Sequence, residues 1–254
     1  WKCQKCQKVE VIGSVDELKK RVRKSGNKYF VMRHGRAESN DKNIVSSKLE
    51  NSHKYPLTEL GKEQVRVSAE KLAGQKIDLI IYSPFERTKE TAFIVAEKIG
   101  LNKEYVISDK RLMEVDGGIF DGKPIADYHA YFSSTLEKFT KATPEGENLN
   151  NLKKRMGEFL YEIEKKYSGK NILIVSHEYP IWMLYGVFNG LGNDDLVREK
   201  HERGSDFIKF ANLERTKYLN LPRDLTGQMD PHRPYVDEII LRCKKCSSKM
   251  NRVR

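Results

Sequence analysis

Two short apolar segments, far apart in this chain, each lead directly into a histidine. Residues 29–32 precede the tripeptide Arg-His-Gly at 33–35, and residues 172–176 precede His177. Such runs are typical of buried strands, and open α/β sheets bind ligands in the crevice beyond the carboxyl ends of neighbouring parallel strands. The pattern therefore predicts a parallel sheet with both imidazoles at one edge.

The stretch between and around these histidines alternates strand-like and helix-like patterns. In chain order we expect strands at 28–32, 77–82 and 172–176, an edge strand near 207–210, and helices at 58–74, 86–100, 149–167 and from about 180. Residues 36–56 are polar and long enough to form a functional loop. This alternation predicts an α/β fold, a three-layer sandwich with a largely parallel sheet.

The residues after these strands supply each part that phosphoryl transfer requires: a nucleophile, cationic donors and a proton for the leaving group. His34 can attack phosphorus through an unprotonated ring nitrogen. The guanidinium groups of Arg33 and Arg87 match phosphate oxygens and can reach the same crevice. His177, if protonated, adds charge, and clustered cations keep His34 neutral. Glu114 is the candidate proton donor, because burial raises the pKa of a carboxyl group.

Five blocks of sequence, taken together, resemble one enzyme family. They are RHGRAESN at 33–40, YPLTELGKEQ at 55–64, SPFERTKET at 83–91, LMEVDGG at 112–118 and VSHE at 175–178. In this order they resemble the histidine phosphatase (phosphoglycerate mutase-like) superfamily over roughly residues 27–215. The resemblance implies the phosphoglycerate mutase-like fold, a small phosphorylated substrate, a phosphohistidine intermediate and no catalytic metal.

The same resemblance implies a role for each candidate residue. His34 is the nucleophile, Glu114 the general acid, and the phosphate pocket is formed by Arg33, Asn40, Arg87 and His177, with Ser46 as a loop contact. We expect a phosphatase rather than a mutase, because the additional basic and aromatic motif of the glycolytic mutases is not recognisable.

Residues outside these motifs have simpler interpretations. His53, His129 and His201 are expected to be ordinary surface or loop histidines. The aromatic residues of the region 119–147 are expected either to pack as a lid core or to stack on a substrate ring; they are Phe120, Tyr128, Tyr131 and Phe132.

The four cysteines form two pairs, one at each end of the chain. Cys3 and Cys6 make one CxxC pair, Cys243 and Cys246 make the other, and 236 residues lie between the two pairs. Paired CxxC knuckles are the usual way to hold structural Zn²⁺ with four thiolates. Closing a floppy loop of this length costs ~5 kcal/mol, less than the roughly 10–16 kcal/mol of structural zinc binding. Zinc is the prediction, and disulfides or four unrelated thiols are the alternatives.

Positive charge is concentrated at the two ends. Residues 1–26 carry eight Lys/Arg against three acids, residues 221–254 eight against four, and residues 27–220 are nearly balanced. A basic module favours a polyanionic partner such as nucleic acid, or serves only as a solvated surface. No apolar run approaches the ~18–20 residues needed to span a bilayer, and we recognise no signal peptide, so we expect a cytoplasmic protein without a membrane partner.

The terminal segments resemble a second family. WKCQKCQKVEVIGSVDELKKR at 1–21 and DPHRPYVDEIILRCKKC at 230–246 are similar to isoleucyl-tRNA synthetase near the end of its editing insertion, where a split zinc knuckle occurs. The chain opens on Trp1 and has neither adenylation signature, so we expect a piece of a longer isoleucine-tRNA ligase that does not itself charge tRNA.

The two resemblances together predict a domain organisation. Residues 1–26 and 221–254 form a small zinc-ribbon-like module of the synthetase, and residues 27–220 form a histidine phosphatase-like domain inserted into it. The expected partners are the remainder of the synthetase and, through the basic module, tRNA. A non-catalytic phosphate- or tRNA-binding module and an accessory editing activity remain open as alternatives.

Overall fold

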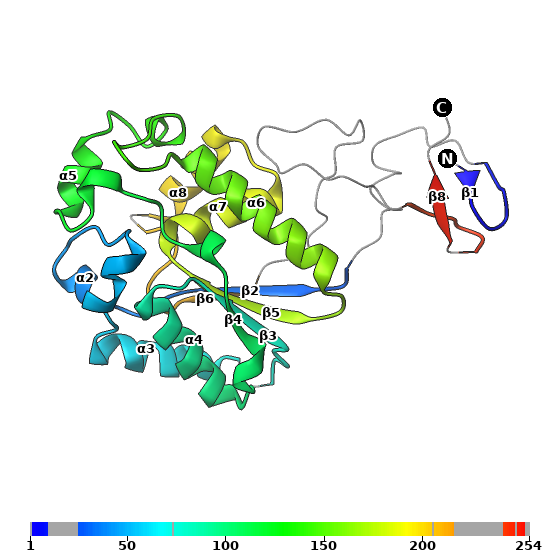
Figure 1. The fold of residues 1–254 in the computed structure, drawn as a ribbon, viewed down its shortest axis with the longest axis horizontal. Coiled ribbons are helices and arrows are strands. Elements are labelled where there is room, and N and C mark those ends of the chain that lie inside the picture. The colour runs from blue at the N-terminus through cyan, green and yellow to red at the C-terminus, as the bar shows by residue number, and fades with distance from the viewer. Residues whose placement is uncertain are drawn as a thin grey trace.

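A five-stranded sheet organises the middle of the chain (Figure 1). The structure is a computed structural model that describes residues 2–9, 25–72, 74–204, 206–215, 241–246 and 248–251. The strand order is β4-β3-β5-β2-β6, with bounds β2 (Lys28–Arg33), β3 (Leu79–Tyr82), β4 (Val106–Ser108), β5 (Asn171–Ser176) and β6 (Leu213–Arg215). All neighbouring pairs are parallel except β2 and β6, so the sheet is largely parallel, as predicted.

The strands are apolar throughout because both faces of the sheet are covered, which is the usual environment of parallel strands. In β2, Tyr29 and Val31 belong to one buried core, while Phe30 and Met32 belong to the other. This alternation follows from the two-residue period of a strand. The sheet therefore forms the middle of three layers.

Helices form the outer two layers (Figure 1). One face packs against α3 (Glu59–Glu70) and α4 (Glu86–Ile99), and the other packs against α6 (Leu149–Lys166), α7 (Glu178–Asn189) and α8 (Asn193–Arg203). The Thr58 hydroxyl accepts a hydrogen bond from the Gly61 N–H and caps α3, and Gly100 ends α4 with a φ of 70°. The three-layer α/β sandwich is thus confirmed.

The connecting segments differ from the prediction in detail. Residues 207–210 are not a strand, and the edge strand is β6. The side chains of the consecutive residues Phe207 and Ile208 are both buried in the same core, which the alternation of a strand does not allow. Short helices fill the long loops: α2 (Glu38–Asp41), η1 (Leu49–Lys54), η2 (Lys103–Tyr105), η3 (Lys110–Leu112), η4 (Gly118–Phe120), α5 (Ile125–Ala130) and η5 (Glu137–Phe139).

A second, small antiparallel sheet joins the two ends of the chain. Its strand order is β1-β8-β7, with bounds β1 (Lys2–Cys3), β7 (Leu241–Arg242) and β8 (Lys249–Asn251). Residues 10–24 and 216–240, which include much of the synthetase-like sequence, lie outside the described residues. Within the described part of the chain, no helix combines the length and the apolar character needed to cross a membrane.

Candidate active site

The two motif histidines lie side by side at the carboxyl edge of the sheet. Strands β2 and β5 pair in parallel with Arg33 opposite Ser176, so His34 and His177 follow adjacent strand ends. The His34 N–H donates to the Ser176 carbonyl oxygen at 3.0 Å, and the two imidazole centroids are 5.2 Å apart. The sequence pattern therefore brings both rings to one place.

The contacts of His34 define which ring nitrogen carries the proton. Its Nδ1 lies 2.7 Å from the Gly35 carbonyl oxygen, which can only accept, while its Nε2 faces the Nε donor of Arg87 at 3.2 Å. Nδ1 is therefore protonated and Nε2 keeps its lone pair. Burial and the charges of Arg87 and Arg33 hold the pKa of His34 well below its usual range. The ring is neutral, and Nε2 can act as a nucleophile once Arg87 releases its lone pair.

Arg87, in the first turn of α4, connects His34 to the loop that follows β2. Its Nη1 donates to the Ser46 hydroxyl at 2.9 Å, and its Nη2 donates to the Ser46 carbonyl oxygen at 3.0 Å. The Nη2 atom also lies 3.0 Å from Nδ1 of His177. Burial lowers the pKa of Arg87 to about 10, so the guanidinium stays charged at neutral pH.

His177 lies behind Arg87 and is a neutral acceptor in this structure. Its Nδ1 accepts from Arg87, so its proton is on Nε2, 2.8 Å from the Ser83 hydroxyl. Burial, together with the charge of Arg87, holds the pKa of His177 well below its usual range. His177 therefore does not carry the positive charge that a protonated ring would add to the pocket, because the cations that surround it disfavour protonation.

Arg33 is the second buried guanidinium of the site. Its Nη1 donates to the Ile208 carbonyl oxygen at 2.9 Å and lies 3.2 Å from Glu178 Oε2 and 3.9 Å from Asp206 Oδ1. The guanidinium stacks on the Phe210 ring, 4.1 Å from its centroid. Among the described residues, its buried Nε has no hydrogen-bond partner. A buried donor without a partner is costly, which indicates an acceptor supplied by a ligand.

Glu114 lies in the loop after η3 with its carboxylate near both arginines. Its Oε1 accepts from the Val115 N–H at 2.8 Å. Burial raises the pKa of Glu114 to about 7, although this backbone N–H and the Arg87 charge oppose the shift. Arg155 holds the loop, because it donates to the carbonyl oxygens of Met113 at 2.8 Å and Glu114 at 3.0 Å. A carboxyl with this pKa can carry a proton at neutral pH.

The polypeptide around His34 is packed too tightly for a side chain at Gly35. A Cβ at this position would collide with the carbonyl oxygen of Gly61 in α3. The Gly35 N–H also donates to the Thr91 hydroxyl at 3.2 Å. Asn40 follows in α2, where its Oδ1 accepts from the Ala37 N–H at 2.9 Å. Glycine is thus required where the nucleophile loop meets the helix layer.

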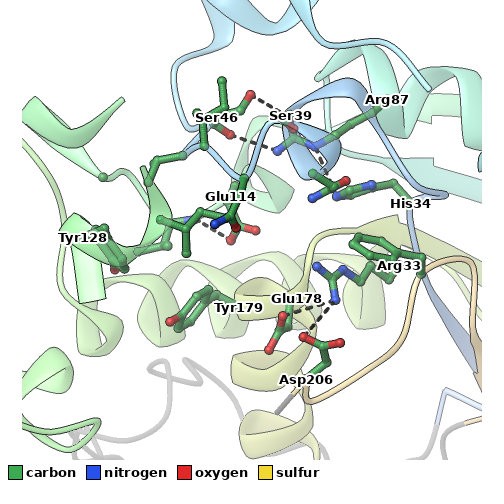
Figure 2. A pocket seen from close by; sticks show the side chains of 18 of the residues that line it. Arg33, His34, Ser39, Ser46, Arg87, Glu114, Tyr128, Glu178, Tyr179 and Asp206 are labelled. Atoms are coloured by element: carbon green, nitrogen blue, oxygen red, sulfur yellow. Dashed lines mark hydrogen bonds and ion pairs between the residues drawn. The ribbon is translucent and has the colours of Figure 1, made fainter. Parts of the chain in front are cut away.

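A cavity of about 360 Å³ opens in front of these groups (Figure 2). Six of the predicted site residues line it: Arg33, His34, Asn40, Ser46, Arg87 and Glu114. His177 contacts Arg87 but does not line the cavity. Of the four aromatic residues of the region 119–147, Tyr128 lines it, and the buried ring of Phe132 packs 5.3 Å from Tyr128.

Sequence reasoning missed several residues of the cavity wall. They include Ser39, His129, Glu178, Tyr179, Lys200 and Asp206. Glu178 and Tyr179 directly follow His177, so their place in the chain was a usable signal. His129 was interpreted as an ordinary surface or loop histidine; it is indeed exposed, but it also lines the cavity, which no motif or periodicity marked.

The four cysteines meet in the small sheet. Their sulfur atoms all lie within 4.8 Å of one another, with Cys3 3.4 Å from Cys246 and Cys6 3.7 Å from Cys243. These separations exceed the ~2.05 Å of a disulfide bond and are close to the ~3.8 Å edge of a tetrahedral Zn–S₄ site with ~2.3 Å bonds. The cluster is thus of metal-binding dimensions.

Comparisons with known proteins agree with this geometry. Phosphoserine phosphatase 1 of Hydrogenobacter thermophilus is 27% identical over 169 residues, 65% of this chain and 77% of that protein. A probable phosphoglycerate mutase of Yersinia enterocolitica is 30% identical over 167 residues, 64% of this chain and 74% of that protein. The structure of a mycobacterial glucosyl-3-phosphoglycerate phosphatase with VO3 has the same fold, with a TM-score of 0.62 at 22% identity over 74% of this chain and 91% of that one.

The family match covers most of the chain and all five phosphatase-like blocks of sequence. It spans residues 29–208 and therefore includes both histidines, both arginines and Glu114. With its mostly parallel sheet and this set of side chains at the carboxyl edge, the chain belongs to the histidine phosphatase superfamily (branch 1).

Proposed function

We propose that this chain is a phosphomonoesterase that hydrolyses a small phosphorylated substrate through a phosphohistidine at His34. One observation carries the proposal: a neutral imidazole whose Nε2 keeps its lone pair shares a cavity with a carboxyl group, Glu114, whose pKa is about 7. The phosphatases among the relatives act on small phosphorylated molecules by name, which supports the same substrate class here.

In the first step, Nε2 of His34 attacks phosphorus. The N–P bond forms as the P–O ester bond breaks, and the leaving oxygen takes the proton held by Glu114. Arg87 turns its donors from His34 and Ser46 to the phosphoryl oxygens, and the partnerless Nε of Arg33 binds another. Charge on the phosphoryl group is thus matched by two guanidinium groups that already line the cavity.

In the second step, water hydrolyses the phosphohistidine. Glu114, now a carboxylate, accepts a proton from water as the water oxygen attacks phosphorus. The N–P bond breaks, phosphate leaves and His34 returns to its neutral form. Asn40 and Ser46 complete the phosphate pocket, and His177 orients Arg87 through its Nδ1 acceptor.

The test is hydrolysis of an aryl phosphate and a panel of phosphorylated metabolites by the wild-type chain and two histidine variants. His34→Ala is expected to abolish turnover and the acid-labile, base-stable phosphate on the protein. His53→Ala is the matched control, because His53 is exposed and does not line the cavity. Full hydrolysis by His34→Ala would exclude the mechanism. If the wild-type chain hydrolyses no ester but binds phosphate or tRNA, the chain is a binding module instead.

We propose further that the cysteine cluster is a structural zinc site and that residues 1–26 and 221–254 belong to an isoleucyl-tRNA synthetase, with residues 27–220 as the inserted domain. The four sulfur atoms support the metal, and the sheet that joins both chain ends supports one terminal module. The proposed partners are the rest of that cytoplasmic synthetase and, through the basic ends, tRNA. The test compares tRNA binding by the full chain and by a fragment of residues 27–220. Salt-sensitive binding by the full chain, and none by the fragment, would support this organisation.

A further inference from the structure

A buried lysine lies behind the end of the cavity that is far from His34. Lys138, on η5, is only 5% exposed and forms no ion pair with a carboxylate among the described residues. Its ammonium lies 2.8 Å from Nδ1 of His129 and 3.0 Å from the Tyr179 hydroxyl oxygen. Burial lowers the pKa of Lys138 to about 8, so it is still charged at pH 7. The reaction proposed above does not use it.

The ammonium determines the hydrogen-bonding roles of both partners. Because an ammonium group can only donate, Nδ1 of His129 and the oxygen of Tyr179 must accept. The His129 ring therefore carries its proton on Nε2, and the Tyr179 hydroxyl keeps its own proton for another acceptor. Both residues line the cavity, and neither of these donors has an acceptor among the residues that the structure describes.

These donors lie where the alcohol part of a phosphoester would extend. In Figure 2, Glu114 lies between two groups of side chains. The arginines are at the phosphate end of the cavity, and Tyr179 and Tyr128 are at the opposite end. Lys200 also lines this end, where it pairs with Glu178, and its Nζ is 5.4 Å from the centroid of Tyr179. Since Glu178 already pairs with Lys200, the positive charge that makes this end suitable for a negatively charged group rich in acceptors comes from Lys138.

We propose that Lys138 positions Tyr179 and His129 to bind a carboxylate on the alcohol part of the substrate. Two donors match the two oxygens of a carboxylate, whereas a neutral hydroxyl gains much less from the charge of Lys138. Lys138 is a positioning residue, since it reaches the cavity only through its partners. The inference rests on the proposed phosphatase function and narrows its substrate class.

Two matched pairs of substrates test this directly at pH 7. Phosphoserine differs from phosphoethanolamine by one carboxylate, and 3-phosphoglycerate carries a carboxylate where glycerol 3-phosphate carries a hydroxymethyl group. We expect kcat/KM to favour the carboxylate member of each pair by about tenfold or more, as for other hydrogen bonds to a charged group. Equal values, or a preference for the member without the carboxylate, would overturn the inference and leave the phosphatase function standing.

Variants separate positioning from a structural role. Tyr179→Phe and Lys138→Met are expected to lower the carboxylate preference about tenfold, mainly through KM, whereas Lys154→Met, on the exposed side of α6, leaves it unchanged. A merely structural lysine would instead reduce both members of a pair equally and so contradict the inference. If Lys138→Met fails to fold, Tyr179→Phe still tests carboxylate recognition, because it keeps the aromatic ring and removes only the hydroxyl group.

Binding to His34→Ala, measured by calorimetry with the same pairs, tests carboxylate recognition independently of turnover. If no ester is hydrolysed but the carboxylate member binds more tightly, the inference stands and the proposed function fails. Equal binding of both members would overturn the inference.

Discussion

The Nε atom of Arg87 donates a hydrogen bond to Nε2 of His34 at 3.2 Å. The lone pair of that ring nitrogen accepts this bond and is therefore directed at Arg87, and the arginine charge lowers the pKa of the same ring. One side chain thus orients the nucleophile, keeps it unprotonated and offers donors to a phosphoryl group. This arrangement makes the geometry of Arg87, and not only its charge, important for the proposed reaction.

Arg87→Lys is therefore expected to lower kcat/KM for an aryl phosphate about 10²–10³-fold, although the positive charge is kept. A lysine cannot present the planar donors that now reach His34, His177 and Ser46. Arg66→Lys, at an exposed arginine of α3, is the control. Activity of Arg87→Lys within a few-fold of wild type would show that charge alone is sufficient.

The pH dependence of kcat/KM should report the protonation of Glu114. The proposed acid must hold its proton, so the rate is expected at its full value below pH 7 and to fall about tenfold per pH unit above it. Glu114→Gln is expected to slow an alkyl phosphate about 10²–10³-fold and an aryl phosphate much less, because the aryl leaving group needs little protonation. An unchanged alkaline limb in Glu114→Gln would assign that ionisation to another group.

Glu114 should also make the folded protein less stable at high pH. Its folded pKa, about 7, is raised above the usual value of 4.5, so the stability associated with the neutral carboxyl is complete below pH 4.5 and lost as pH rises through 7. Glu114→Gln is expected to raise the free energy of unfolding by up to about 3 kcal/mol at pH 8 and by little at pH 4. Urea denaturation at both pH values measures the difference. Equal effects at the two pH values would contradict it.

Arg155 is expected to act on catalysis through the backbone that carries Glu114. Its guanidinium binds the carbonyl oxygens of Arg111, Met113 and Glu114 and pairs with Glu147. Arg155→Met should lower stability by about 2–3 kcal/mol, because several acceptors lose their donor.

In the same variant, hydrolysis of alkyl phosphates should fall more than hydrolysis of aryl phosphates, since only the proton donor is displaced. Arg198→Met, at an exposed arginine of α8, is the control. An equal loss with both leaving groups would point to general unfolding rather than misplacement of Glu114.

Metal removal should separate the terminal module from the active site. We expect one zinc ion per chain, lost in Cys243→Ser and Cys246→Ser, by elemental analysis. Aryl phosphatase activity should persist after chelation, because the reacting groups proposed here are side chains of residues 33–177. Loss of activity together with the zinc would show that the site depends on the terminal module.

Much of the fold was readable from the sequence because its signals are local. The apolar runs before His34 and His177 predicted the two central strands, and Thr58 and Gly100 predicted where helices begin and end. The expected edge strand at 207–210 was wrong, because an apolar run does not reveal whether its side chains face one side or two.

The sequence by itself determined the parallel sheet, the two histidines at one edge and the paired cysteines, because each depends on short patterns of residues. Only the tertiary structure decided the neutral state of His177 and the contacts of Lys138 with His129 and Tyr179. Those properties depend on burial and on hydrogen bonds between residues from different elements, and such contacts exist only once the layers have packed together.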